Sequence, residues 1–454
     1  MNRLLPALLV SCALTAQEAP ADRLIREVAS RNELMPNLEA LCDGIGPRLT
    51  GSGRLRRAQA WAQARLRAYG ALNVHEEAYD LGRPWRRGVA RARLLNANGQ
   101  RLHLDQMAWT EGTGGPVRGE VRILRLKTLQ ELEAAAPELK GRIVLLLEHP
   151  RATDEERKDL VAFRARLAKA WYKAACGLLL LPSDKSDGLQ NMGGGPGFPY
   201  TRATAFLSHE DASLLQRLAS RGVVPRVEAE LGGGFGPKPV RAFNVVGEIP
   251  GAERPDEVVI VAVHEDSWDL ATGATDNGTG TVVALEVLRA MKASGLRPRR
   301  TLRVVLFSGE EEGLLGSRAY LKAHAAELGQ VQAVLVDDSG SGRITGFPDM
   351  LVDAWYDALT AALQPAAGLG AADVPYGIIG GSDQETFFDA GIPAFAAVQD
   401  PLDYETVTHH SQVDTVDHVD PAALVQGAQV MAVAAWGLLN GPKLPHQPRH
   451  AAGP

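Results

Sequence analysis

Two histidines and several carboxylates in the second half of the chain have the residue types that divalent metal sites use. They are His264, Asp276, Glu310, Glu311, Asp338 and His410. Imidazole and carboxylate ligands without cysteine suit zinc or a similar divalent cation. Two such ions, about 3.5–4 Å apart, can share one carboxylate and one water, which then becomes hydroxide near neutral pH. A further carboxylate must take the proton of that water, and the adjacent Glu310 and Glu311 offer one base and one ligand.

A buried strand delivers the first of these residues. Residues 258–263, Val-Val-Ile-Val-Ala-Val, are typical of a short strand that is buried on both faces, and His264 follows at once. Asp276 comes twelve residues after His264, just before a helical pattern that begins near Gly278. Open α/β sheets place their sites at the carboxyl ends of strands. This stretch therefore predicts half of a two-metal site, with the other half supplied by later segments.

From residue 242 onward, predicted strands and helices alternate. The strands cover residues 258–263, 301–307, 331–336 and 393–398, and the helices cover 278–293, 314–326, 351–363 and 421–439. This alternation predicts an α/β fold with a mainly parallel mixed sheet covered by helices on both faces. The carboxyl ends of such strands lie at one edge, so residues far apart in sequence come together there.

Each candidate also has a plainer interpretation. A lone histidine after a strand is usually an ordinary loop residue, and three successive glutamates at 310–312 are favoured at a helix N-terminus. Asp337 and Asp338 fit a turn, and Asp414 fits a helix cap. Taken together these plainer interpretations are less convincing, because all of them would have to hold for five residues that are expected at the same sheet edge.

Length and composition indicate a soluble protein of more than one domain. The chain has 454 residues, about three typical domains in length, and is 45% hydrophobic and 22% charged. Its net charge of −6 gives no reason to expect nucleic acid as a partner. Cys42 and Cys176 are too few for a disulfide framework or a thiolate metal site. No apolar run beyond the N-terminal leader is long enough to span a membrane.

The composition changes along the chain and predicts five segments. They are a leader (1–21), an N-terminal part of the main domain (22–82), an inserted β-rich domain (83–236), the remainder of the main domain (237–442) and a tail (443–454). The leader has Arg3 before an apolar stretch, which predicts export to the periplasm or the cell exterior. Leu9-Val10-Ser11-Cys12 also resembles a lipobox, so a lipid anchor on Cys12 stays open. The glycine-rich loop 192–197 does not link a strand to a helix, so we interpret it as mobile and not as a phosphate site.

Six motifs in the second half of the chain resemble one enzyme family. They are His264–Asp269, Gly273–Gly280, Phe307–Ser317, Asp338–Gly340, Gly380–Asp383 and His409–Thr415. In this order they resemble the co-catalytic zinc exopeptidases that include bacterial and fungal aminopeptidases and carboxypeptidase Q. The inserted segment resembles the protease-associated domain of the carboxypeptidase Q branch. The resemblance implies the zinc exopeptidase fold, two zinc ions per chain and short peptides as substrates, and leaves a homodimer open.

The resemblance also implies a role for each residue. One ion would be held by His264 and Asp338, the other by Glu311 and His410, and Asp276 would bridge them. Glu310 would be the general base, and Asp266 would orient the His264 ring. The Asp276–Asn277 peptide would be cis.

Some assignments depend on register or remain open. In the family pattern the ligand precedes x-Gly-Leu, so the resemblance implies Glu311 as the ligand within the glutamate triple, and by the same comparison Ser339-Gly340 implies Asp338 over Asp337. The family ligand lies four residues before the Asp of Asp-Thr, so the resemblance implies His410 as the ligand and leaves His409 for substrate. Asp269 and Asp383 are expected to be structural or supporting residues.

Substrate contacts are less defined than the metal ligands. Gln384 replaces a histidine that many relatives have after Ser-Asp, which puts local contacts to substrate in doubt. Tyr404 and Tyr376 are candidates for stabilising an oxyanion, with a packing role as the alternative for each.

The predicted function is that of an aminopeptidase or dipeptidase that cleaves short peptides with a metal-bridging hydroxide and a glutamate base. Two alternatives remain. One is a metal-dependent amidohydrolase or a glutaminyl-cyclase-like enzyme. The other is a non-catalytic binding protein on the same fold, which the complete ligand set disfavours.

Overall fold

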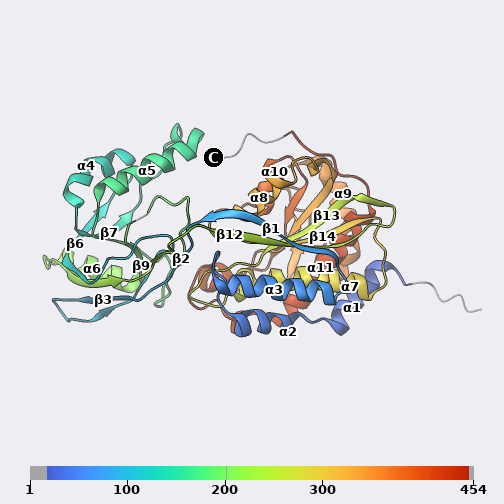
Figure 1. Cartoon of the computed structure of the whole chain (residues 1–454), viewed down its shortest axis with the longest axis horizontal. Helices are drawn as coiled ribbons and strands as arrows, with labels where there is room; N and C mark the ends of the chain where they lie inside the picture. Colours follow the sequence, from blue (N-terminus) through green and yellow to red (C-terminus); the bar gives the residue numbers. More distant parts are fainter. Residues whose placement is uncertain (1–17, 201, 449–454) are drawn as a thin grey trace, which may run out of the picture.

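The computed structural model describes residues 18–200 and 202–448 of the chain. Within these residues the strands form two large sheets, of six and eight strands, that lie at opposite ends of an elongated molecule (Figure 1). Residues 1–17, which include Cys12 and most of the expected leader, lie outside the described residues. The first described element is α1 (Pro20–Arg31), whose Leu24 and Val28 are fully buried.

The six-stranded sheet is mixed and mainly parallel, as the sequence predicts. Its order is β1 (Leu72–Gly82), β12 (Val240–Ile249), β14 (Arg300–Phe307), β13 (Arg254–His264), β15 (Val331–Val336) and β17 (Ala394–Ala396). The last four strands pair in parallel, whereas β12 is antiparallel to both of its neighbours. The carboxyl ends of β14, β13 and β15 therefore lie side by side.

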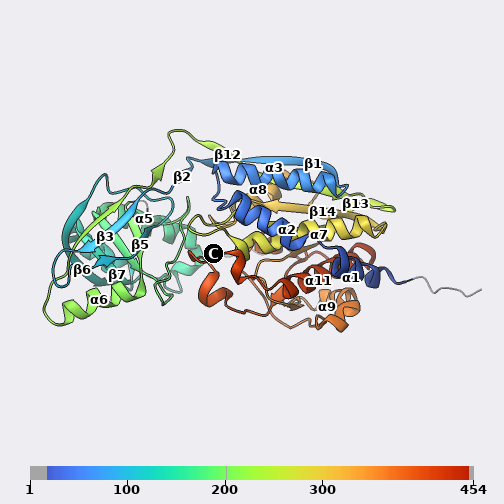
Figure 2. The same ribbon diagram turned by 90° about the horizontal axis from the view of Figure 1, so that it is seen from below.

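Strand β13 is buried on both faces because its apolar residues alternate between two cores. Val259, Val261 and Val263 belong to the larger core, and the residues between them belong to the smaller core on the opposite face. The helices that cover the two faces are α1, α2 (Leu34–Glu39), α3 (Gly53–Ala68), α7 (Thr279–Ala293), α8 (Leu315–Ala323), α9 (Asp353–Leu363), α10 (Gln384–Asp389) and α11 (Pro421–Asn440). Figure 2 shows α3, α2, α7 and α11 together on one face, and α8 and α10 lie over the other (Figure 1).

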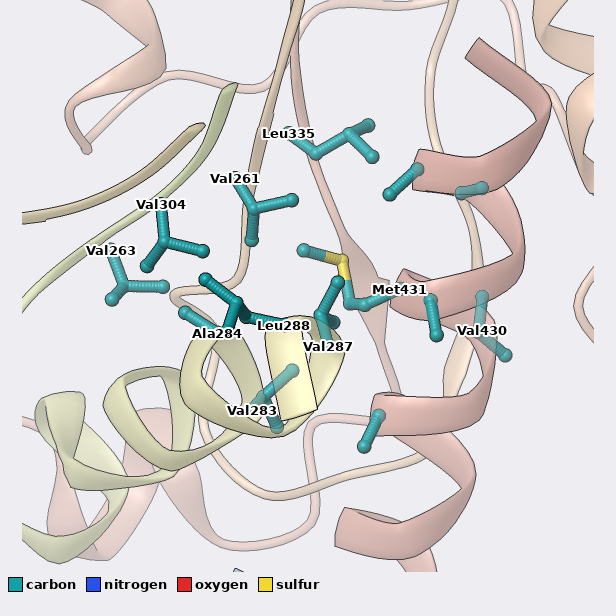
Figure 3. Packing of buried hydrophobic residues seen from close by; sticks show 14 of the residues in the cluster. Val261, Val263, Val283, Ala284, Val287, Leu288, Val304, Leu335, Val430 and Met431 are labelled. Atoms are coloured by element: carbon teal, nitrogen blue, oxygen red, sulfur yellow. The ribbon is translucent and has the colours of Figure 1, made fainter. Parts of the chain in front are cut away.

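The larger core packs helix α7 and helix α11 against the sheet. Val261, Val304 and Leu335 of three neighbouring strands face Leu288 of α7 and Met431 of α11 (Figure 3). Among the described residues, α11 is the one helix that is long and apolar enough to cross a membrane, and 78% of its most apolar window is buried inside the fold. The composition of α11 is therefore explained by its place in this core.

The eight-stranded sheet is built from residues 90–231. Its order is β4 (Arg101–Leu102), β3 (Ala90–Leu94), β10 (Arg226–Leu231), β6 (Val117–Arg125), β7 (Ile143–Glu148), β8 (Leu178–Pro182), β9 (Thr204–Leu207) and β5 (Leu104–Gln106). It is accompanied by α4 (Leu129–Leu139), α5 (Leu160–Ala174) and α6 (His209–Ser220). We call this part of the chain the insert, because it interrupts the six-stranded sheet between β1 and β12.

The two crossings between the sheets are paired with each other. The outgoing β2 (Trp85–Arg86) and the returning β11 (Gly234–Phe235) form a two-stranded ribbon. Next to it, Arg87 makes an ion pair with Asp269 of the loop after β13, with an N···O distance of 2.6 Å. Asp269 therefore has a structural contact that ties the connection between the two sheets to the loop of the candidate site.

Candidate metal centre

His264 ends β13 with its ring held from one side and surrounded by carboxylates on the other. Its Nδ1 lies 3.2 Å from the backbone oxygen of Asp266 and 3.6 Å from Asp266 Oδ1. Its Nε2 lies 3.1 Å from Asp338 Oδ1 and 3.3 Å from Asp276 Oδ1. If Nδ1 carries the single proton of a neutral ring and donates it to the Asp266 carbonyl, the lone pair on Nε2 faces two carboxylates. A cation between these atoms would remove that repulsion.

His410 has the matching arrangement on the other side of Asp276. Its Nε2 lies 2.9 Å from Glu311 Oε2 and 3.4 Å from Asp276 Oδ2. Both oxygens of Glu311 and Oδ2 of Asp276 are buried without a hydrogen-bond partner among the described residues. Buried polar atoms are normally satisfied, so these orphaned oxygens fit the ligands of a cation.

Asp276 joins the two halves, because one of its carboxylate oxygens faces His264 and the other faces His410. The five candidate ligands thus divide into two sets, one with His264 and Asp338 and one with His410 and Glu311. The Asp276–Asn277 peptide is cis, as the resemblance implies.

Another grouping of ligand atoms exists in the same place. Asp276, His409 and His410 present atoms within 4.8 Å of one another, as His264, Asp276 and Asp338 do. We favour Glu311 over His409 as the partner of His410, because Glu311 Oε2 is 2.9 Å from His410 Nε2 and has no hydrogen-bond donor among the described residues. His409 is partly exposed, and its Nδ1 lies 3.5 Å from Glu405 Oε2.

The acidic residues next to Glu311 and Asp338 in the sequence take different positions from these two candidate ligands. Glu310 Oε2 is 4.0 Å from His264 Nε2, and Glu310 lines the open cavity described below. Glu312 is buried, and the carboxylate that pairs with His410 is that of Glu311. Asp337 is also buried, and its backbone oxygen accepts a 2.8 Å hydrogen bond from Asn277. The structure thus brings Glu311 and Asp338 to the histidines, in the register that the resemblance implies.

The carboxylates of the cluster repel one another. Burial raises the pKa values of Glu310 and Glu311 well above their usual range, and the neighbouring carboxylates add to the shift. Burial would lower the pKa of His264, but Asp338, Asp266 and Asp276 raise it well above its usual value. Bound cations would offset this excess of buried negative charge.

The buried Asp414 positions the loop that carries Asp276. Its carboxylate accepts hydrogen bonds from Thr275 N at 2.7 Å, Thr275 Oγ1 at 2.7 Å and Asp276 N at 3.1 Å. From the sequence alone, Asp414 could equally be the cap of a helix. We expect Asp414→Ala to lower metal affinity or kcat/KM by about 10–100-fold, the usual cost of removing a residue that orients a ligand.

This expectation is checked by metal titration and steady-state kinetics. Asp417, three residues further on and outside the cluster, provides the control Asp417→Ala. Equal values for the two variants would show that Asp414 does not position Asp276.

Two residues from the N-terminal segment also support the site, and no pattern in the sequence could have found them. Thr50 Oγ1 donates to Asp266 Oδ2 at 3.0 Å and accepts from Gly309 N at 3.0 Å. Arg48 is fully buried and donates to backbone oxygens of the loop between β13 and Asp276. These contacts join segments that lie far apart in sequence, which periodicity cannot reveal.

The candidate ligands open into a cavity of about 850 Å³ between the insert and the main domain. Arg164, Phe198 and Pro199 of the insert line it, and the opposite part is lined by Asp276, Glu310, Glu311, Asp338, Tyr404 and His410. Another cavity of similar size lies on the insert and contains none of the candidate site residues. The cavity at the ligands is therefore the candidate substrate site.

The residues expected near substrate divide between this cavity and its surroundings. Tyr404 lines the cavity, whereas Tyr376 is 75% exposed and lies outside the lining. Gln384 also lines the cavity, and the neighbouring Asp383 is fully buried. His409 lines it as well, beside His410. The structure thus keeps Tyr404 as a candidate for the oxyanion and gives Tyr376 no place at the site.

The glycine-rich loop of the insert reaches this site, which its sequence does not predict. Met192 N donates to the backbone oxygen of His410 at 2.8 Å, and Gln190 N donates to Gln412 Oε1 at 2.8 Å. A Cβ on Gly195 would lie 3.1 Å from the backbone of Glu312. The loop that we expected to be mobile is therefore tied to the segment that carries His410. Only its glycine content hints at this close approach of two backbones.

Comparison with known proteins identifies the family. The model of peptidase family M28 matches residues 244–435. Carboxypeptidase Q of Mus musculus is 32% identical over 415 residues, which cover 89% of this chain and 85% of the relative. The chain belongs to peptidase family M28. It is therefore a peptidase, and the exopeptidase-family resemblance of its motifs is confirmed.

Solved structures agree with this assignment. A peptidase M28 precursor from Shewanella amazonensis has a TM-score of 0.81 and 30% identity, and the match covers 94% of this chain and 98% of that one. A zinc aminopeptidase from Bacillus subtilis has a TM-score of 0.67 at 19% identity, covering 92% of this chain and 96% of that one, which shows a shared fold. The mixed α/β fold expected from the sequence is thus confirmed.

Proposed function

We propose that this chain is a two-zinc exopeptidase that hydrolyses short peptides. The observation that carries the proposal is the division of donors around Asp276, whose two oxygens face His264 with Asp338 and His410 with Glu311. Two histidines and three carboxylates suit zinc, and the orphaned buried oxygens of Glu311 and Asp276 fit ligands. The Bacillus subtilis neighbour, described as a zinc aminopeptidase, agrees with this choice of metal.

The residues of the chain would divide the chemistry between them. When bound, the two ions would lower the pKa of the attacking water and polarise the scissile carbonyl. Glu310 lines the cavity and lies further from His264 Nε2 than Asp338 and Asp276 do, so it is free to accept the water's proton and pass it to the leaving amine. Burial raises the pKa of Tyr404, which keeps its hydroxyl protonated and able to donate to the oxyanion.

We also propose that the insert is a protease-associated domain that limits access. Its residues Arg164 and 197–199 form one wall of the cavity, whose volume of about 850 Å³ suits a small ligand. A long folded substrate would meet this wall, whereas a dipeptide or tripeptide fits beside it. Export through the N-terminal leader, with or without a lipid on Cys12, remains part of the proposal.

A substrate panel tests this function. The zinc-loaded protein is assayed on free dipeptides, the same dipeptides blocked at the amine or at the carboxylate, and N-acyl amino acids. We expect hydrolysis of free dipeptides, and the blocked series shows which terminus is recognised. Turnover of N-acyl amino acids alone would favour an amidohydrolase and contradict the proposal, as would the absence of any turnover by zinc-loaded protein.

A further inference from the structure

His410 has less support from the six-stranded sheet than the other candidate ligands have. His264 is the last residue of β13, and Asp338 comes two residues after β15. His410 lies in a segment of turns, eleven residues after the two-residue strand β18 (Val398–Gln399). Its side chain is 34% exposed, whereas the side chains of the other candidate ligands are at most 7% exposed. The position of His410 must therefore be fixed by contacts outside this sheet.

A loop of the insert makes contacts with the backbone at His410. We call residues 183–192, which follow β8, the docking loop. Asn191 of the docking loop forms an antiparallel bridge with Ser411, and Met192 N donates to the backbone oxygen of His410 at 2.8 Å. The backbone of His410 has a left-handed conformation with a φ of 52°. A residue other than glycine keeps this conformation only where its surroundings hold it, and the docking loop is part of those surroundings.

Two side chains extend this contact to both sides of His410. Lys185 of the docking loop is buried, and its Nζ donates to the backbone oxygen of Glu405 at 2.8 Å. On the other side, the amide of Gln412 accepts one backbone hydrogen bond from the docking loop at 2.8 Å and donates another at 3.1 Å. The docking loop therefore holds the chain before, at and after His410.

The docking loop has internal support of its own. Asn191 Nδ2 donates to Asp184 Oδ1 at 2.8 Å, and Asn191 Oδ1 accepts from Ser183 Oγ at 2.6 Å and from Asp184 N at 3.2 Å. The side chain of Asn191 thus closes the loop on itself, while the backbone of the same residue pairs with Ser411. A loop that is fixed in this way can hold a second segment in place.

We propose that the docking loop positions His410 and thereby sets the affinity for the ion that His410 and Glu311 would hold. Lys185 and Gln412 are the positioning residues. The inference rests on the proposed two-zinc centre. Ligands that supporting contacts orient bind metal more weakly when those contacts are removed. The insert would therefore have a second task besides forming one wall of the cavity.

The other half of the metal centre has separate support. His264 ends β13 and Asp338 follows β15, and these two strands pair in parallel within the six-stranded sheet. In the part of the chain that the structure describes, no hydrogen bond joins the docking loop to either residue. Loss of a docking-loop contact should therefore weaken the binding of one ion and leave that of the other unchanged.

The competing explanation is that neighbouring rings alone fix His410. The centroid of its ring lies 5.9 Å from that of Trp268 and 3.9 Å from that of His409. In that case the contacts of the docking loop would stabilise the fold and close the cavity without affecting the metal. The two explanations therefore differ in the zinc affinity that remains when a docking-loop contact is removed.

Zinc titration of the metal-free proteins, with a competing chelator, tests the proposal. Lys185→Met keeps the length of the side chain and removes the donor to Glu405, and the control Lys173→Met makes the same change at an exposed lysine of α5. His410→Ala identifies which of the two binding steps belongs to His410. We expect Lys185→Met to weaken that step by about 10–100-fold, the usual cost of losing a residue that orients a ligand, and to leave the other step as in the control.

Equal zinc affinities in Lys185→Met and the control would overturn the proposal, whatever the change in the free energy of unfolding, and so would an equal loss at both steps. If the unaltered chain binds a single zinc, the two-zinc function fails by that result alone. Weaker binding of this ion by Lys185→Met would then still support the role of the docking loop, and unchanged binding would overturn it. An unaltered chain that binds no zinc contradicts both proposals.

A second variant covers the case in which Lys185→Met does not fold. Gln412→Ala removes two other hydrogen bonds to the docking loop, and Gln364→Ala is its control at an exposed position of the main domain. The expected loss at the His410 step and the results that would overturn the proposal are the same as for Lys185→Met.

Discussion

Glu310→Gln is expected to lower kcat on a free dipeptide by about 10²–10⁴-fold, which is the usual contribution of a general acid–base residue. The amide keeps the shape of the side chain but cannot accept the proton of the attacking water. Glu310 Oε2 is 4.0 Å from His264 Nε2, further than the oxygens of Asp338 and Asp276, so zinc content should be unchanged. Steady-state kinetics and elemental analysis of the same preparation measure both quantities.

Glu253→Gln is the matched control for this variant. It makes the same chemical change on the surface, where the side chain of Glu253 is 68% exposed. A Glu310→Gln protein with zinc bound and activity close to the control would show that another group is the base. Loss of zinc together with activity would instead make Glu310 a ligand.

Arg48→Met is expected to destabilise the main domain by about 3–5 kcal/mol, the cost of breaking a buried charged hydrogen-bond network. The Arg48 guanidinium is fully buried and donates to the backbone oxygens of Glu265, Thr272 and Gly273, each at 2.7 Å. Methionine fills a similar volume but leaves these three carbonyls without the guanidinium donors. Because those carbonyls belong to the loop between β13 and Asp276, metal affinity should fall as well.

Urea unfolding of the metal-free proteins measures the change in the free energy of unfolding. Arg54→Met removes an exposed arginine from the same segment and serves as the control. A difference between the two variants of less than about 0.5 kcal/mol, the size of an ordinary surface substitution, would contradict the role assigned to Arg48.

The parts of the fold that follow from local pattern could be predicted from the sequence. The apolar run 258–263 marks β13 because only a strand with helices on both faces buries every residue of such a run. The same reasoning placed His264, Glu311 and Asp338 near one edge. In the structure, His264 and Asp338 are in direct contact, and Glu311 meets them through His410 and the shared Asp276.

The parts that depend on contacts between distant segments could not be predicted. Thr50 and Arg48 support the site from a loop whose sequence is typical of an ordinary turn. The loop around Met192 contacts the backbone of His410, and apart from its glycine content no local pattern in the sequence indicates that approach. Tyr376 is a residue that the sequence suggested and the structure does not support. Its hydroxyl could stabilise an oxyanion, but its side chain is exposed.

The most direct measurement of the central claim is a zinc titration of the metal-free enzyme, followed by activity on a free dipeptide. If Asp276 is shared between two ions, activity rises until two equivalents of zinc are bound, and Asp276→Ala removes activity and weakens the binding of both ions. Full activity at one equivalent, or unchanged zinc binding after Asp276→Ala, would contradict the two-zinc centre.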